Sequence, residues 1–372
     1  MRGVNQSVPE ANPLGSSAKV RQTGAVKAWR VSRYGRPAEV MALEDVPTPE
    51  PGPGEVRIRV SSITLNFNDL DAIYGRYQTI PLVPPFTPGM EVLGRVDLCG
   101  PNAEAWMGRR VVAVPGGAHS GYAEAVIAPT AMTFEMPADI PEPAAAAIFM
   151  PFHLAWLGLH ERGRLQAGET LLVHAGAGGI GSAAVQLGAA AGARVVATAG
   201  SGRKLALCEE LGAEVVVDYR RADFVDAVLT ATDGRGVDVA FDTLGGAVTR
   251  STFSCMAFNG RHLMVGFTSG IEAEDEGIVP RPIVFGNLSL CGVCLAYVDN
   301  PRDAKQASNG YNFPSHADGE RIHTRLVDLV HQATVRPLVG LELPFASLPV
   351  GLEALQNRET VGRVVVGLSG GP

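Results

Sequence analysis

Aromatic residues and positive charge are both in short supply in this sequence. Phe, Tyr and Trp make up only 6% of the 372 residues, so Ala, Val and Leu must build most of the core. Lys and Arg number 31 against 38 Asp and Glu, which gives a formal net charge of −7. A mildly acidic chain without a basic run is not expected to bind nucleic acid or an anionic membrane. Any phosphate site must therefore be local, built from backbone amides and one or two cations.

Cysteine is also sparse, and no secretory signal accompanies it. Met1–Gln22 is polar and lacks an apolar stretch, so we expect a disordered leader over residues 1–24 and a cytoplasmic protein. Five scattered cysteines then fit free thiols in a reducing compartment. Cys291 and Cys294 form a CxxC, but they lie in a strand-like run, where residues three apart point to opposite faces. A structural role is therefore favoured over a redox or metal-binding role.

Signs of a metal centre, a hydrolase and a membrane span are missing too. The eight histidines are dispersed, with no HxxxH and no paired CxxC motifs, so no metal site is predicted. No GxSxG motif marks a nucleophilic serine. The long uncharged stretches Pro143–His160 and Thr170–Ala193 are interrupted by Pro, His, Gln and Gly. We interpret both as buried structure of a soluble protein and expect no membrane association.

Glycine and proline, in contrast, are abundant, with 44 and 26 residues. In the first part of the chain they separate short strand-like runs, which predicts a turn-rich barrel or sandwich. These runs are Arg57–Val60, Leu93–Leu98, Arg110–Val114 and Tyr122–Ala128.

From about residue 145, apolar strand-like runs alternate with helical ones, which predicts a parallel sheet with both faces covered. Strands are expected at Thr170–Ala175, Arg194–Ala199, Val215–Asp218, Val237–Phe241, His262–Val265 and Leu288–Val293, and helices at Gly181–Ala191 and Arg203–Leu211. After about Asn300 the alternation ends. A helix at Arg321–Gln332 and a last strand at Gly362–Leu368 then fit a return to the first domain.

The most specific motif is the GxGxxG sequence at residues 176–181, which follows an expected strand and opens an expected helix. In this context Gly176 permits the tight turn, Gly178 lets a pyrophosphate approach the backbone, and Gly181 allows the helix to pack on the strand. The helix N-terminus presents free amides and a partial positive charge to the phosphates. The sequence therefore predicts a dinucleotide site.

The end of the second strand indicates which dinucleotide binds. An NAD site usually has Asp or Glu there, to bind the ribose 2′-hydroxyl. This chain reads Ala199-Gly-Ser201 instead, followed by Arg203 and Lys204. A hydroxyl and cations suit a 2′-phosphate, so we predict NADPH as the cofactor. The alternative for Arg203 and Lys204 is a solvated first helical turn.

Several further segments accompany the GxGxxG motif: Asn66–Asp69, Pro88–Glu91, His174–Gly181, Asp238–Asp242 with Gly245 and Gly246, Val265–Thr268, and Thr360–Arg363. Together they resemble the zinc-free branch of the medium-chain dehydrogenase/reductases, the NADPH:quinone oxidoreductase-like proteins. The resemblance runs from about residue 27 to residue 368. It implies an α/β fold with two domains. One is a GroES-like, partly open β-barrel catalytic domain, discontinuous over residues 25–146 and 299–372. The other is a Rossmann domain over residues 147–298, a doubly wound parallel sheet that binds NADPH.

The contrast with the zinc-dependent branch limits the chemistry. This chain has Asn66 where that branch has a Cys ligand, and Met90 where a His precedes the Glu. No Cys or Asp stands near residues 149–152 for the third ligand, and only Cys99 lies in the region of the structural zinc lobe. Without a Lewis acid, direct alcohol–carbonyl interconversion is disfavoured. Reduction of a quinone or of an activated C=C bond remains, because there the charge delocalises.

The resemblance also implies which residues bind the cofactor. The residues at the pyrophosphate are Gly176, Ala177, Gly178, Gly179, Ile180 and Gly181. Those at the 2′-phosphate are Ser201, Lys204 and Tyr219. Those beside the nicotinamide are Val265, Gly266 and Phe267, with Arg363. By the same resemblance Asn66 and Tyr77 line the substrate pocket. Tyr77 is expected to donate a proton or hydrogen bond to a developing oxyanion, unless it is a packing residue on a loop. Asp69 is expected to brace the following helix.

Two departures from the family pattern bear on the substrate. His153-Leu154-Ala155 stands where the family has Leu-Thr-Ala, so His153 is a candidate proton donor, with a satisfied core histidine as the alternative. Asn300–Gly319 is interpreted as a polar loop, in place of a shorter helical connection, and it is a candidate cap on the pocket.

The sequence thus predicts a zinc-independent NADPH-dependent oxidoreductase that transfers a hydride to a quinone, an enone or an enal. One alternative is an enoyl-thioester reductase with the same cofactor site. Another, of a different class, is an NADPH-binding sensor or structural protein with little turnover. A homodimer is expected, because Asn287–Val293 corresponds to the edge strand that pairs in the family, and an exposed apolar edge needs covering.

Overall fold

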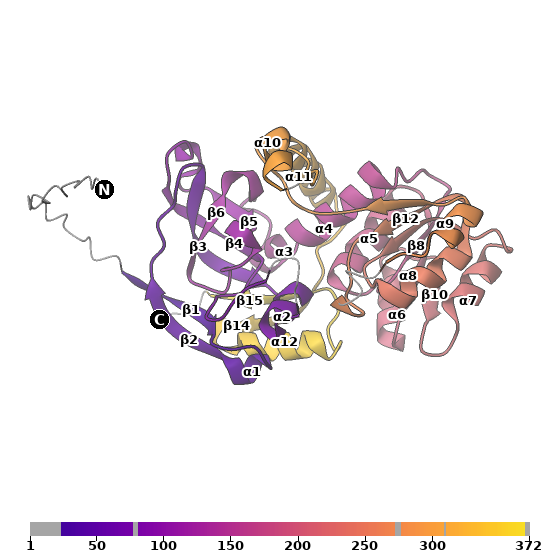
Figure 1. Cartoon of the computed structure of the whole chain (residues 1–372), viewed down its shortest axis with the longest axis horizontal. Coiled ribbons are helices and arrows are strands. Elements are labelled where there is room, and N and C mark those ends of the chain that lie inside the picture. The colour runs from indigo at the N-terminus through magenta and orange to yellow at the C-terminus, as the bar shows by residue number, and fades with distance from the viewer. Residues whose placement is uncertain (1–23, 77–80, 272–276, 309, 369–372) are drawn as a thin grey trace, which may run out of the picture.

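The computed structural model describes residues 24–76, 81–271, 277–308 and 310–368. Figure 1 shows two parts side by side, with helices α4 (Phe149–Trp156) and α11 (His316–His331) where they meet. Nearly all of the expected leader, and Tyr77, lie outside the described residues. None of the helices in the described part of the chain combines the length and the hydrophobicity that crossing a bilayer requires.

The first part is built on a seven-stranded, mainly antiparallel sheet in the order β14-β15-β3-β4-β5-β7, with β6 also paired to β3. Its strands are β3 (Glu55–Thr64), β4 (Glu91–Cys99), β5 (Arg110–Ala113), β6 (Ala125–Pro129), β7 (Thr133–Glu135), β14 (Val339–Pro344) and β15 (Arg363–Gly367). A separate hairpin-like pair joins β1 (Ala25–Val31) to β2 (Met41–Pro47). The sheet encloses a core of small aliphatic side chains, as the scarcity of aromatic residues requires.

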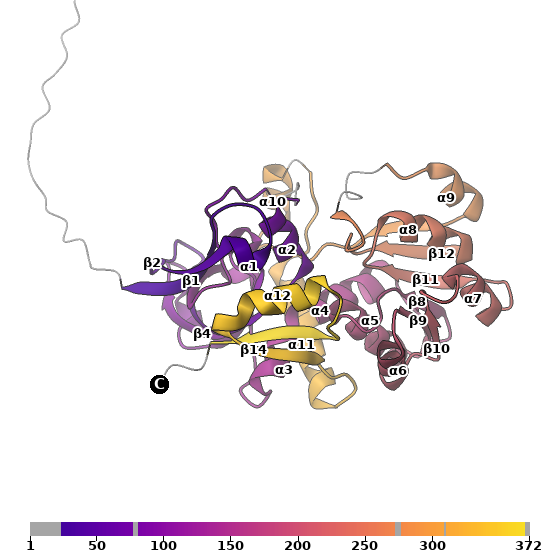
Figure 2. The same cartoon turned by 90° about the horizontal axis from the view of Figure 1, so that it is seen from below.

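The C-terminal segment returns to this first part. β15 pairs antiparallel with β3, with Val365 opposite Thr64, and β14 lies parallel to β15. Between them α12 (Leu348–Gln356) packs on α1 (Pro37–Val40) and α2 (Phe67–Tyr74), as the yellow segment in Figures 1 and 2 shows. The predicted β tail is therefore present, and the fold is the expected GroES-like domain joined to a Rossmann-type domain. The domain boundaries themselves stay a prediction.

The second part is a six-stranded sheet in the order β10-β9-β8-β11-β12-β13, and every neighbouring pair is parallel. Its strands are β8 (Thr170–Val173), β9 (Arg194–Ala199), β10 (Val215–Asp218), β11 (Val237–Asp242), β12 (Met256–Met264) and β13 (Ser289–Gly292). Its helices include α5 (Gly179–Ala190), α6 (Gly202–Glu210), α7 (Phe224–Ala231), α8 (Gly246–Thr252) and α9 (Pro280–Gly286). Strand β13 forms the outer edge, where Asn287–Val293 was expected to pair with a second copy. That pairing stays a prediction.

Alternating side chains divide this sheet between two cores. Leu171 and Val173 of β8 face the core that contains α4, α5 and α6, whereas Leu172 faces the core that contains α7. Because successive strand residues point to opposite faces, a continuous apolar run fills both sides. The first of these cores continues into the barrel through Phe134 and neighbouring residues, so the two parts share one hydrophobic interior.

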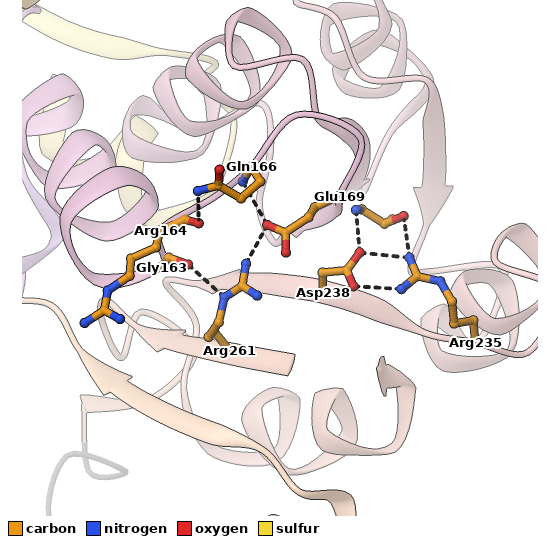
Figure 3. Close-up of polar contacts among 8 residues, drawn as sticks. Gly163, Arg164, Gln166, Glu169, Arg235, Asp238 and Arg261 are labelled. Atoms are coloured by element: carbon orange, nitrogen blue, oxygen red, sulfur yellow. Dashed lines mark hydrogen bonds and ion pairs between the residues drawn. The ribbon is translucent and has the colours of Figure 1, made fainter. Parts of the chain in front are cut away.

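The amino-terminal edge of the same sheet is closed by ion pairs. Asp238 accepts two hydrogen bonds from Arg235, at 2.7 and 2.8 Å, and one from the backbone N–H of Thr170 (Figure 3). Glu169 accepts from Arg261 at 2.5 Å. These contacts fasten strands β8, β11 and β12 at the end of the sheet that lies opposite the GxGxxG loop.

The expected polar loop at Asn300–Gly319 is wrong, because the segment contains helix α10 (Pro301–Ala307) and the first turn of α11. Asn300 caps α10, and its side-chain oxygen accepts from the N–H groups of Arg302 and Asp303. Ser315 caps α11 in the same way, so this helix begins five residues before the predicted Arg321. The helices that these side-chain caps stabilise therefore form even though the polar composition of the segment favours a loop.

His153 is fully buried where α4 meets α11 and β7. The carbonyl oxygen of Glu135 can only accept, so His323 donates to it through Nε2, at 3.0 Å. His323 Nδ1 then accepts from His153 Nε2 at 3.0 Å, and His153 Nδ1 accepts from the hydroxyl of Tyr297 at 2.9 Å. This chain satisfies each ring nitrogen of the two neutral histidines. The geometry is that of a satisfied core histidine, and the proton-donor role of His153 stays a prediction without support here.

This histidine pair should make the fold sensitive to acid. Burial lowers the pKa of His323 to about 4, and burial together with His323 holds the pKa of His153 well below its usual value. The unfolded state therefore takes up protons first, so the stabilisation is complete above pH 6.5 and is lost as the pH falls toward 4. For His323 alone we expect a loss of about 2 kcal/mol of unfolding free energy by pH 5.

Chemical denaturation at pH 7 and pH 5 measures this effect. His323→Gln preserves one acceptor and one donor without titrating, so it should reduce the loss between the two pH values. Arg325→Gln, at an exposed position of the same helix, removes a residue type that stays protonated throughout this pH range, so it is the matched control and should leave the loss unchanged. Equal pH dependence in wild type and His323→Gln would contradict the prediction.

Candidate functional site

The GxGxxG loop joins the end of β8 to the start of α5, in the predicted strand–turn–helix context. A Cβ atom on Gly176 would lie 2.9 Å from Cβ of Ala197, and one on Gly181 would collide with the carbonyl oxygen of Ala175. Packing therefore requires both of these glycines. A Cβ on Gly178 would meet only the oxygen of Ala175, at 3.3 Å. Packing thus constrains Gly178 less than the other two glycines, which is consistent with the predicted close approach of a pyrophosphate at this position.

The remaining predicted cofactor residues lie at the same edge of the sheet. In an α/β sheet of this type, ligands bind outside the carboxyl ends of the strands. Ser201 follows β9, Tyr219 follows β10, and residues 265–267 follow β12. Val265 donates its N–H to the carbonyl oxygen of Asp242 at 2.8 Å, and Phe267 lies against Gly245. The structure therefore gathers residues from the ends of four strands at one edge of the sheet.

A group of cations surrounds Lys204 near the end of β9. The Lys204 ammonium donates to the carbonyl oxygen of Arg358 at 2.7 Å. Burial and the charges of Arg220, Arg358 and Arg203 lower the pKa of Lys204. Like charges held together in this way favour an anion between them. Arg220 and Arg358 were missed by the sequence reasoning, because Arg358 lies 154 positions from Lys204 and carries no motif of its own.

Tyr219 lies beside these cations. Its side chain is 42% exposed, and its hydroxyl oxygen would be only 2.6 Å from a Cβ atom on Gly200. The absence of that Cβ lets the phenol ring lie over the end of β9, next to Ser201. The predicted 2′-phosphate residues therefore adjoin one another.

The C-terminal segment touches the loop directly. Gly362 donates its N–H to the carbonyl oxygen of Ala177 at 2.9 Å, and the two backbones form a parallel bridge at Gly178 and Gly362. The next residue, Arg363, packs its side chain on Gly179, where a Cβ atom would lie 2.6 Å from Arg363 Cδ. The phosphate loop is thus held by residues of both domains.

Arg363 joins this loop to the catalytic domain. Its side chain is 6% exposed; Nη1 donates to Oδ1 of Asn66 at 2.9 Å, and Nη2 donates to Oε2 of Glu91 at 2.6 Å. Its Nε–H is buried without a partner. An unpartnered buried donor is costly, and protein atoms cover this nitrogen, so the cost falls on the contact between the two domains.

Glu91 is a third residue whose role the sequence reasoning missed. It is 1% exposed; Oε1 accepts from the backbone N–H of Met150 at 2.9 Å, and Oε2 also accepts from the hydroxyl of Thr64. The sequence feature that could have identified Glu91 was a single carboxylate at the start of an apolar strand. A buried carboxylate needs a cation or several donors, and here it has both.

Asp69 braces the start of α2, as the sequence predicted. Its carboxylate accepts from the N–H groups of Asn66 and Gly89, at 2.9 and 3.2 Å, and from the hydroxyl of Tyr122 at 2.7 Å. Burial raises the pKa of Asp69 to about 6, although these hydrogen bonds and the charge of Arg363 oppose the rise. Every oxygen of Asp69 is engaged, which is the geometry of a helix cap.

A recess runs beside the first turn of α2, and Asn68, residues 88–90 and residues 117–119 line it. His119 is the half-buried histidine there, its Nδ1 lies 2.7 Å from Oγ of Ser120, and burial lowers its pKa. Tyr77, the predicted proton donor, lies outside the described residues.

Comparison with known proteins agrees with this architecture. Residues 52–138 match the family described as alcohol dehydrogenase GroES-like domain, and residues 179–309 match the one described as zinc-binding dehydrogenase. A quinone oxidoreductase-like protein 2 homolog from Nematostella vectensis is 34% identical over 77% of this chain and 79% of its own length. Human quinone oxidoreductase is 30% identical over 73% and 80%. The chain belongs to the quinone oxidoreductase-like medium-chain dehydrogenase/reductases.

Members of this family are oxidoreductases that bind pyridine nucleotides. Among solved structures, a mycobacterial protein complexed with NADPH superposes with a TM-score of 0.79, at 28% identity over 92% of this chain and 99% of that one. The description of the second family names zinc. In the described part of this chain, no group of three or more His, Cys, Asp or Glu is placed to hold a metal ion. Oδ1 of Asn66 accepts instead from a guanidinium.

The two kinds of glycine in the loop give a prediction. Gly178→Ala fits the backbone, whose φ and ψ there are −78° and 175°, so its thermal midpoint should stay within about 2 °C of wild type. Its methyl group should weaken pyridine-nucleotide binding at least about tenfold, because it blocks the backbone. Gly181→Ala should instead lower the midpoint by several degrees through the clash with Ala175.

Fluorescence titration with NADPH and NADH, together with thermal unfolding, separates the two effects. Gly367→Ala, in β15 of the barrel, where a Cβ atom would meet open space, is the control and should change neither measurement. Unchanged nucleotide affinity in Gly178→Ala would contradict the assignment.

Proposed function

We propose that this protein is an NADPH-dependent reductase of quinones or of C=C bonds conjugated to a carbonyl group. The observation that carries the cofactor choice is the cluster of Arg203, Lys204, Arg220 and Arg358 at the end of β9. No acidic residue stands at Ala199–Ser201 to bind a free 2′-hydroxyl, whereas four cations suit a 2′-phosphate.

The bound nicotinamide would supply the hydride, and the protein supplies binding and orientation. The loop at residues 176–181 would hold the pyrophosphate through the first N–H groups of α5, with the side chain of Arg363 packed on Gly179 of the same loop. Residues 265–267, at the carboxyl end of β12, would flank the nicotinamide. NADPH binding by a protein of the same fold is consistent with this arrangement.

The acceptor class is supported by the polar groups at the start of α2. Asn66 and Met90 are poor ligands for a Lewis acid, so the site relies on hydrogen-bond donors and the charge of Arg363. Such groups suffice where the negative charge spreads over a conjugated carbonyl. The names of the Nematostella and human relatives point to quinones.

An acceptor panel tests the proposal. The purified full chain should oxidise NADPH in the presence of duroquinone, an enal or a cyclic enone, and added zinc should not increase the rate. Turnover restricted to enoyl thioesters would favour the enoyl reductase alternative. Tight NADPH binding without turnover on any acceptor would overturn the reductase and favour a sensor.

The cation cluster gives a separate prediction on selectivity. Lys204→Ala and Arg358→Ala should each raise the Kd for NADPH about tenfold, the size of one lost charge-assisted hydrogen bond, and leave the Kd for NADH within about twofold. Arg302→Ala, on the exposed face of α10, is the control for loss of one positive charge. Equal losses for both nucleotides would show that these cations do not read the 2′-phosphate.

A further inference from the structure

The amide of Asn66 has only one possible orientation in this structure. Arginine has donors and no acceptors, so the Asn66 atom that meets Arg363 Nη1 at 2.9 Å must be the oxygen. The amide nitrogen then lies on the other side, where it donates one hydrogen to the carbonyl oxygen of Thr64 at 3.3 Å. An amide nitrogen carries two hydrogens, so a second donor on Asn66 remains for another acceptor.

Arg363 is itself held on several sides, so it fixes this orientation firmly. Its second terminal nitrogen is paired with Glu91 at 2.6 Å, its backbone N–H donates to the carbonyl oxygen of Leu338 at 2.7 Å, and its stem packs on Gly179. Glu91 is in turn held by Thr64 and by the N–H of Met150. The planar guanidinium binds Asn66 and Glu91 through two separate nitrogens in a fixed geometry, whereas an ammonium would have to bring both oxygens to one nitrogen.

The guanidinium also changes the amide electronically. A positive charge at Oδ1 polarises the amide and strengthens its N–H groups as donors, and the effect is greater where burial lowers the local dielectric. Asn66 is 7% exposed and Arg363 is 6% exposed, so water screens the pair little. The backbone N–H of Asn66 is bound to Asp69, which holds the residue at the start of α2.

We propose that Asn66 donates its free Nδ2–H to the carbonyl oxygen of the substrate, with Arg363 as the positioning residue that orients and polarises the amide. The inference rests on the proposed reductase function. When the acceptor gains a hydride from NADPH at carbon, its π electrons move to the carbonyl oxygen, and the Asn66 donor stabilises that charge. Solvent then supplies the proton, and the products are the reduced acceptor and NADP⁺.

This arrangement selects the substrate by its oxygen. The unused N–H of Asn66 can pair only with a hydrogen-bond acceptor. During reduction the acceptors present are the carbonyl oxygen of the substrate and the oxyanion that forms from it. Conjugated acceptors that lack a carbonyl oxygen should therefore react poorly. The selectivity comes from the buried donor, which would stay unpaired with such an acceptor.

Three variants test the proposal at saturating NADPH. Asn66→Asp keeps the size, the helix cap and the pairing to Arg363 but removes the N–H groups, so kcat with duroquinone should fall about a hundredfold. Arg363→Lys should lower kcat about tenfold. The double variant should be no worse than Asn66→Asp alone, because the two residues act as one unit. Arg57→Lys, in a half-buried pair with Asp97 of the same barrel, is the control and should keep the wild-type rate.

A second measurement uses the cofactor-free protein, and it does not depend on turnover. In protein labelled with ¹⁵N-asparagine, the Asn66 side-chain signal, assigned by its loss in Asn66→Asp, should shift on addition of duroquinone. Duroquinone is chosen because its four ring methyl groups hinder addition of cysteine thiols. In Arg363→Lys the shift should be smaller.

The outcomes are distinguishable. If the wild type reduces duroquinone and Asn66→Asp keeps more than half of its kcat, the inference is overturned and the proposed function stands. An unperturbed Asn66 signal at saturating duroquinone would also overturn it. If the wild type reduces no acceptor, the proposed function fails first. A shift of the Asn66 signal on addition of duroquinone would then still support Asn66 as a hydrogen-bond donor to the ligand. Absence of the shift would overturn both the proposed function and the donor role of Asn66.

Discussion

The buried guanidinium of Arg363 is the contact on which the arrangement of the site depends. It links the start of α2, through Asn66, to the start of β4, through Glu91, and it lies on the phosphate loop of the other domain. Removing one partner of a buried pair leaves an uncompensated charge and typically costs about 3–5 kcal/mol. The two domains are therefore held in register by a buried group that also packs on the GxGxxG loop.

This contact explains why the chain returns to its first domain. The segment that carries Arg363 also supplies the N–H of Gly362 to the loop and the carbonyl oxygen of Arg358 to Lys204. The C-terminal segment thus contacts both the GxGxxG loop and Lys204 at the end of β9. A Rossmann domain cut off before β14 would keep its glycines and lose both contacts.

Local signals were enough to predict the parts of this site that local geometry determines. The GxGxxG motif and the apolar strands identified the loop, because strand, turn and helix are contiguous in sequence. Glu91 and Arg358 could not be found in this way, since their roles arise from contacts with residues far away in the chain. The segment after Asn300 was misjudged for a different reason. Its polar composition suggested a loop, but Asn300 and Ser315 each start a helix through side-chain hydrogen bonds that composition does not reveal.

His153 and Asn66 illustrate how one polar residue becomes structural and another becomes available for chemistry. Both are buried, and both were candidate catalytic residues in the sequence. The ring nitrogens of His153 are saturated by Tyr297 and His323, so a proton could leave only by breaking a satisfied chain. Asn66 keeps one unused donor, and the neighbouring guanidinium strengthens it. Hydrogen-bond valence, more than residue type, therefore distinguishes the candidate for chemistry from the residue that completes the core.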